Sequence, residues 1–158
     1  MTSRLRGVVC ALVLWTLAIP LLAHHSSAGA FDVHATVSVE GIIARVMLAN
    51  PHSVMYLDAK NAKGGSETWI LYGYPPGMLT RLGYSKSTFK EGLHVTAIGN
   101  PARDSSSLSI AGHVLDAPTH GKTVHVIEVG EVRFADGTVV SFGRGPAFDG
   151  GAKNPVLK

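Results

Sequence analysis

Cysteine is almost absent from this sequence. The 158 residues include a single cysteine, Cys10, which lies in an apolar run close to the N-terminus. A disulfide framework, a thiolate nucleophile and a cysteine-based zinc site all need cysteine in the folded part of the chain. The folded domain is therefore expected to depend on core packing for its stability.

The sequence also lacks a strong charge of either sign. Lys and Arg number 14 against 11 Asp and Glu, and two of the basic residues, Arg4 and Arg6, belong to the N-terminal segment. No basic run with interleaved aromatics is present, so we expect no nucleic-acid partner. HExxH, GxGxxG and P-loop motifs are missing as well. Because no nucleophile and base can be paired, a non-enzymatic role is favoured.

Residues 1–23 have the three-part plan of a secretory signal peptide. Arg4 and Arg6 precede the apolar stretch 8–19, Pro20 breaks it, and Ala23 supplies a small residue at the end. The stretch is too short for a membrane anchor, which needs about twenty residues. We expect cleavage after Ala23 and export to the periplasm without an anchor. The alternative site, after Ala30, would remove His24 and His25.

The apolar pattern has a period of two from residue 36 onward, after a small, polar arm at 24–35. This alternation predicts β-strands with turn residues between them. A one-residue slip is expected near Gly41, since a glycine inside a strand often marks a bulge or bend. The expected strands are residues 37–48, 54–58, 68–72, 94–98 and 108–114.

A short helix is expected after the third strand. Pro76 can begin it and Gly83 can end it, with Met78, Leu79 and Leu82 on the buried side. The chain length predicts one domain. The order of elements predicts a mainly β fold, a small five- to six-stranded OB-like barrel over residues 36–129. Ligands of such barrels usually meet strands two and three and the loops one–two and four–five.

The C-terminal region carries weaker signals. Residues 123–129 and 131–142 alternate, which predicts an additional strand or hairpin at 130–142 with Asp136-Gly137 as a type I′ turn. Residues 143–158 are rich in glycine and proline, so a disordered tail is expected there. Oligomeric state is not encoded in any pattern of the sequence.

Eight histidines suggest a metal site. Cleavage after Ala23 would give His24 a free α-amino group that chelates together with its imidazole, and His25 would add a second imidazole. Amine and imidazole nitrogens suit divalent copper. A third residue, His52 or His34, would complete a tetragonal set. Solvated ends of a mobile arm are the competing interpretation of His24 and His25, and an exposed turn histidine is that of His52.

The other histidines alternate with apolar residues and are expected to point into solvent. They are His94, His113, His120 and His125. An alternative function places a ligand face at Tyr56, Trp69 and Tyr72, where a glycan or an envelope protein would bind without metal. Core packing is the competing interpretation of these aromatics. A copper oxidative enzyme built on the N-terminal chelate is a third hypothesis.

The sequence resembles a family of small exported bacterial proteins that is catalogued as a domain of unknown function. The resemblance rests on the His24-His25-Ser26 start and on Asn50-Pro51-His52, together with Trp69 and Arg81-Leu82-Gly83, and it covers about residues 24–115. It implies a periplasmic β-barrel-like domain and cleavage after Ala23, but no activity. The aromatic residue that often precedes Asn-Pro-His in the family is replaced here by residues 47–49.

Overall fold

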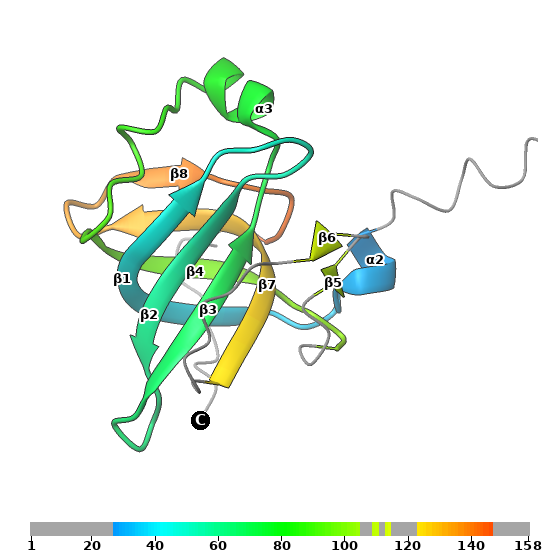
Figure 1. Cartoon of the computed structure of the whole chain (residues 1–158), viewed down its shortest axis with the longest axis vertical. Helices are drawn as coiled ribbons and strands as arrows, with labels where there is room; N and C mark the ends of the chain where they lie inside the picture. The colour runs from blue at the N-terminus through cyan, green and yellow to red at the C-terminus, as the bar shows by residue number, and fades with distance from the viewer. Residues whose placement is uncertain (1–26, 105–108, 111–112, 115–122, 147–158) are drawn as a thin grey trace, which may run out of the picture.

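The structure is a computed structural model, and it describes residues 27–104, 109–110, 113–114 and 123–146. β-strands are the main regular structure of this part of the chain, which also has two short helices (Figure 1). None of the helices among these residues has the length and hydropathy needed to cross a membrane.

Five strands close into a barrel, and a sixth extends one side of it. β1 pairs with both β2 and β4, β2 pairs with β3, and β7 completes the ring by pairing parallel with β3 and antiparallel with β4. This closure, with a short helix after the third strand, confirms the predicted OB-like barrel. The strands are β1 (Val37–Met47), β2 (Val54–Lys60), β3 (Ser66–Tyr72), β4 (His94–Pro101), β7 (Thr123–Phe134) and β8 (Val139–Ser141).

The fifth barrel strand is β7, and the prediction that residues 108–114 fill this place is wrong. The short strands β5 (Ser109–Ile110) and β6 (His113–Val114) pair with each other in a separate two-stranded sheet. β7 instead runs without interruption past residue 129, where the sequence suggested that the barrel ends. Its parallel pairing with β3 joins residues more than fifty positions apart, which a local pattern does not reveal.

β1 is long because it serves two partners. It pairs with β4 over Val37–Ile42 and with β2 over Ile42–Met47. Gly41 lies at the change of partner, where a Cβ would come within 2.7 Å of the Asp58 carbonyl oxygen. The register slip predicted near Gly41 occurs slightly later, between Ile43 and Arg45.

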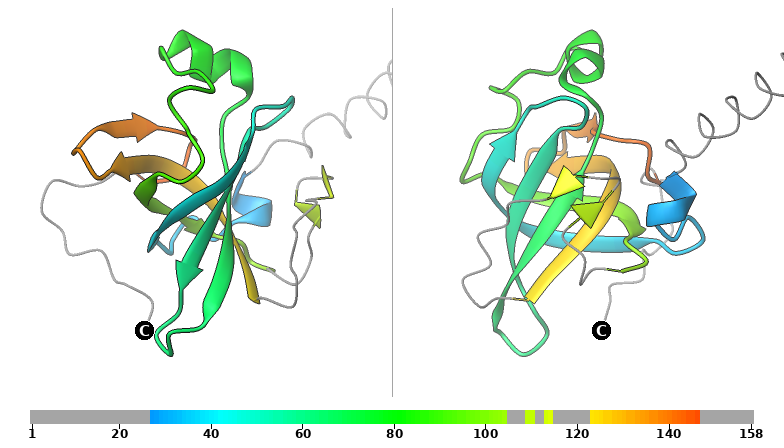
Figure 2. Two further views of the ribbon diagram at one scale, coloured as in Figure 1. Left: turned by 60° about the vertical axis from the view of Figure 1, so that its left-hand side comes forward. Right: turned by 45° about the vertical axis from the view of Figure 1, so that its right-hand side comes forward.

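The barrel interior is apolar, and α3 (Pro76–Arg81) lies at one end of it. Figure 2 shows the helix at the end opposite the tip of the β2–β3 hairpin. Leu79 is the buried residue of the helix, whereas Met78 and Leu82 are exposed, so only one of the three predicted contacts is confirmed. Leu79 joins Phe89 and Phe142 in the core. Pro76 and Gly83 lie at the two ends of the helix as predicted.

The hairpin predicted around Asp136-Gly137 connects β7 and β8. Its loop has three residues rather than the two of a type I′ turn, because the Phe134 N–H donates to the Thr138 carbonyl at 2.8 Å. Beyond β8, residues 143–146 remain close to β7, where the Gly143 N–H donates to the Gly130 carbonyl at 3.2 Å. The rest of the predicted tail, residues 147–158, lies outside the described residues.

Candidate functional site

His52 is fixed against the end of β3. Its Nδ1 lies 3.1 Å from the carbonyl oxygen of Gly73, and its ring centroid lies 4.4 Å from that of Tyr72. A carbonyl oxygen only accepts hydrogen bonds, so Nδ1 carries the proton and the lone pair of the neutral imidazole is on Nε2. His52 is half-buried and is therefore not the exposed turn residue of the competing interpretation.

The N-terminal arm is docked on the barrel. Phe31 forms a β-bridge with Ala102, and its ring lies 5.9 Å from the ring of Tyr72. The Asp32 N–H donates to the Pro101 carbonyl at 2.8 Å. Two consecutive ring contacts, Phe31 to Tyr72 and Tyr72 to His52, thus connect the arm with the candidate site.

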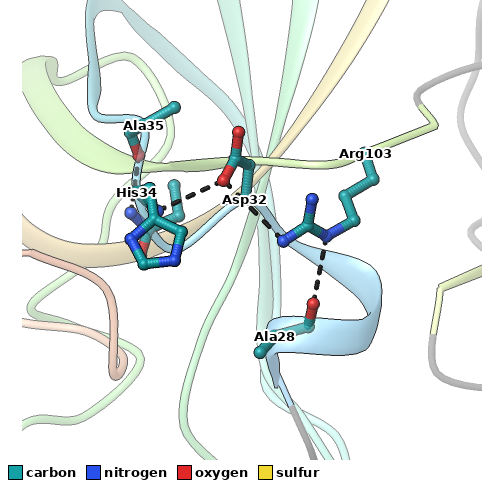
Figure 3. A network of polar contacts seen from close by, with 6 residues as sticks. Ala28, Asp32, His34, Ala35 and Arg103 are labelled. Atoms are coloured by element: carbon teal, nitrogen blue, oxygen red, sulfur yellow. Dashed lines mark hydrogen bonds and ion pairs between the residues drawn. The ribbon is translucent and has the colours of Figure 1, made fainter.

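The guanidinium group of Arg103 contacts the same arm at two points. Its Nε donates to the Ala28 carbonyl at 3.0 Å, and its Nη2 lies 3.8 Å from Asp32 Oδ1 (Figure 3). Ala28 belongs to α2 (Ser27–Ala30), the short helix that precedes Phe31. Arg103 therefore connects α2 with the segment that follows the Phe31–Ala102 β-bridge.

The structure describes two of the four predicted metal ligands, His34 and His52. His24 and His25 lie outside the described residues, two and three positions before Ser27. His34 is exposed, and its backbone N–H donates to Asp32 Oδ1 at 3.2 Å. Among the described contacts none joins His34 to His52. Within the part of the chain that the structure describes, no group of three or more His, Cys, Asp or Glu side chains converges.

The three aromatics of the predicted ligand face do not share a face. Tyr56 and Tyr72 lie on the outside of the barrel in a cluster under the arm, whereas Trp69 belongs to the core cluster. Positions 69 and 72 of one strand differ by an odd number, so their side chains point to opposite faces. All three are buried, with 2%, 5% and 4% exposure for Tyr56, Trp69 and Tyr72.

Trp69 forms a separate cluster with Glu67 and His125. Its Nε1 donates to Glu67 Oε1 at 2.8 Å, and its ring stacks on His125 at 4.4 Å. His125 Nε2 lies 3.5 Å from Glu67 Oε2. His125 is therefore only partly exposed, with 34% of its side chain accessible to solvent, and not fully solvated as predicted.

Of the remaining histidines, His94 is the one whose side chain the structure describes. His94 is exposed as predicted and lies 3.6 Å from Glu40. The backbone of His113 belongs to β6, but the orientation of its side chain is not described, and His120 lies outside the described residues.

A row of buried polar side chains continues from His52 across the outer face. Tyr72 is paired with Glu128, and Glu128 with Asn100, in neighbouring strands. Their exposures are 4%, 8% and 7%. The Asn100 amide donates to the Ala35 carbonyl at 2.7 Å. Among the described residues the Tyr72 hydroxyl has no hydrogen-bond partner. Burial, assisted by the Glu128 charge, raises the pKa of Tyr72 to about 12.

A family of unknown function, DUF6152, matches residues 11–111. The chain belongs to this family. No curated protein matches the sequence. The matched DUF6152 region holds all four predicted metal ligands, His24, His25, His34 and His52, and it includes β1 to β4. It ends before β7, so the strand that closes the barrel and carries Glu128 lies beyond it.

Sequence reasoning missed Glu128 and Asn100. The signal for Glu128 was present, because Val124, Val126 and Glu128 share one strand face and only the last is polar. Asn100 sits at the end of β4, where the sequence suggested a polar loop. Neither residue could be connected with His52 without the long-range pairing of β3 and β7.

Proposed function

We propose that this DUF6152 member is an exported, non-enzymatic copper-binding protein. The ligands are the α-amino group and imidazole of His24, the imidazole of His25 and the Nε2 atom of His52. Amine and imidazole nitrogens form the strongest divalent complexes with copper among the first-row metals. Export follows from the signal-peptide pattern of residues 1–23.

The orientation of His52 carries the proposal. Metal-ligating histidines usually donate their second ring N–H to a carbonyl or carboxylate, which fixes the tautomer and the ring plane. His52 has this arrangement, with Nδ1 at 3.1 Å from the Gly73 carbonyl. A histidine that merely filled a turn would not need this contact, and the half-buried ring is held before any ligand arrives.

The docked arm supports the same ligand set. Phe31 packs on Tyr72, which packs on His52, and Arg103 clasps Asp32 and Ala28 beside them. His25 precedes Ser27 by two residues, and two extended residues span about 7 Å. The covalent chain therefore keeps His25 within about 7 Å of Ser27, on the arm whose Phe31 packs against Tyr72.

The alternative, a glycan or envelope protein bound at Tyr56, Trp69 and Tyr72, has less support. A sugar or a protein side chain stacks on an exposed ring face. These three rings are 2%, 5% and 4% exposed, and Trp69 is on the other side of the sheet. Metal binding is therefore the better account of this end of the barrel.

The proposal is tested on protein exported by its own signal. Intact mass establishes the N-terminus, and a Cu(II) titration with a competing chelator gives stoichiometry and affinity. We expect His24 as the first residue and about one copper per chain, since one chelate supplies one site. His24→Ala should remove most of the affinity, while His94→Ala, an exposed histidine on β4, should not.

Two results would contradict the proposal. One is a mature chain that starts at Phe31, since it would lack both N-terminal ligands. The other is an equal loss of copper affinity in His24→Ala and His94→Ala, which would indicate binding by scattered surface histidines.

A further inference from the structure

The helix–loop segment, residues 76–90, consists of α3 and the first part of the loop that leads to β4. Its inner side is anchored in the barrel. Leu79 and Phe89 are each 1% exposed and belong to the core cluster, and Tyr84 packs against that cluster. The Tyr84 N–H donates to the Leu79 carbonyl at 2.9 Å, which joins the loop to the helix. The exposed side chains of the segment therefore project from a firmly held backbone.

Two of these exposed side chains are apolar. Met78 is 37% exposed and Leu82 is 42% exposed. The Leu82 N–H donates to the Met78 carbonyl at 3.1 Å, so the two residues are one helical turn apart and are neighbours on one side of α3. Single exposed apolar residues need no explanation, so the meaning of this pair depends on the charges that accompany it.

The charged residues of the helix–loop segment are all positive. Arg81, Lys86 and Lys90 are exposed, and residues 68–90 contain none of the 11 Asp and Glu of the chain. Among the residues that the structure describes, none of these three cations forms an ion pair. The segment therefore combines an exposed apolar pair with uncompensated positive charge.

We propose that the outer side of the helix–loop segment docks on an anionic lipid bilayer. Met78 and Leu82 enter the boundary between headgroups and acyl chains, and the three cations meet the lipid phosphates. Apolar side chains beside Lys and Arg are the pattern with which a surface helix binds a membrane interface. The long stems of Lys and Arg let their charges stay at headgroup level while apolar neighbours lie deeper.

A protein partner fits this surface less well. A stable protein interface takes about 20 to 30 residues on each side, which is more than this short segment exposes. A bilayer needs no matching shape, and its phosphates supply the charge that the segment lacks. The inference is independent of the proposed copper site.

The test measures co-sedimentation of the metal-free mature protein with two kinds of vesicle, phosphatidylglycerol mixed with phosphatidylcholine, and phosphatidylcholine alone. We expect binding to the anionic vesicles, and we expect it to weaken as salt is added, because salt screens exposed charges. Lys86→Gln/Lys90→Gln should weaken this binding by roughly tenfold or more, since each cation near an anionic leaflet contributes roughly fivefold.

Lys60→Gln/Lys63→Gln is the matched control. Both lysines are exposed, but they belong to the hairpin that joins β2 to β3, at the other end of the barrel (Figure 2). There they lie between the acids Asp58 and Glu67 in the sequence. The control variant loses the same net charge and should bind the vesicles like the natural protein.

Met78→Ser/Leu82→Ser tests the apolar part of the surface. It should weaken vesicle binding several-fold, whereas Ile42→Ser, at a position of β1 that is also 42% exposed, should not. Exposed positions tolerate such substitutions, so the thermal midpoint of each variant should stay close to that of the natural protein.

The inference is overturned if the natural protein does not bind the anionic vesicles, or binds phosphatidylcholine alone equally well. It is also overturned if either segment variant keeps the natural affinity, or if the control lysine variant loses as much as Lys86→Gln/Lys90→Gln, since net charge alone would then explain the binding. Copper is absent from the assay, so none of these results bears on the proposed function.

Discussion

Two histidines of this protein lie against an aromatic ring at the same distance, yet their surroundings differ. His52 lies 4.4 Å from Tyr72 on the outside of the barrel, and His125 lies 4.4 Å from Trp69 on the inner face. His52 contacts a backbone carbonyl through Nδ1, whereas His125 contacts the Glu67 carboxylate through Nε2. A histidine ring packed on an aromatic is thus not in itself a site.

The partner atom decides what each ring can do. The Gly73 carbonyl accepts from Nδ1 of His52, so the acceptor nitrogen of this ring is Nε2. Glu67 engages His125 and the Trp69 indole together, so its carboxylate ties three side chains into a structural unit. This difference is the reason for which we propose binding at the His52 end and a packing role for the His125 cluster.

Trp69→Ala should have the largest effect on stability, because it removes the ring on which the His125 cluster is built. Removing a buried tryptophan costs about 3 to 5 kcal/mol of unfolding free energy through lost burial and the cavity it leaves. The variant also loses the indole hydrogen bond to Glu67. Urea unfolding followed by circular dichroism measures the change, with Met78→Ala on the exposed side of α3 as the control. A loss below that of Met78→Ala would remove Trp69 from the core.

An alkaline titration tests Tyr72, the ring that packs on His52 on the outside of the barrel. The pKa of Tyr72 is raised from 10.0 to about 12, so the folded state favours the neutral phenol. This contribution to stability is present below pH 10 and is lost as the pH rises through 12. The free energy of unfolding of the metal-free protein should fall by about 2 to 3 kcal/mol over this range relative to Tyr72→Phe. Parallel pH profiles for the two proteins would show that Tyr72 ionises as an exposed phenol does.

Glu67→Gln should have the smallest effect. The amide oxygen can still accept from the Trp69 indole, and only the partly exposed ion pair with His125 is lost. Such pairs contribute less than about 1 kcal/mol. Chemical denaturation of this variant beside His125→Ala gives the size of the effect. A loss as large as that of Trp69→Ala would mean that the carboxylate, rather than the ring, holds this cluster together.

The local elements of the fold were predictable, but the closure of the barrel was not. Apolar alternation predicted β1 to β4, and Pro76 and Gly83 predicted the ends of α3. Such elements are predictable because their sequence signals lie within a few residues of one another. The segments around residues 110 and 127 both alternate, so alternation could not tell which one joins β3. That choice depends on which apolar face fits the barrel interior.

The candidate site was predictable only in part. The Asn50-Pro51-His52 turn drew attention to His52, but its partner Gly73 is 21 residues away and contributes only a backbone atom. Counting positions along β3 would already have separated Trp69 from Tyr72. The row of Tyr72, Glu128 and Asn100 required the registers of two strand pairs, and no sequence motif records it.

The most direct measurement is the electron paramagnetic resonance spectrum of Cu(II) bound to the mature protein, compared with His52→Ala and His125→Ala. We predict nitrogen coordination that is reduced in His52→Ala and unchanged in His125→Ala. Identical spectra for the natural protein and His52→Ala would show that His52 is not a copper ligand and would contradict the account.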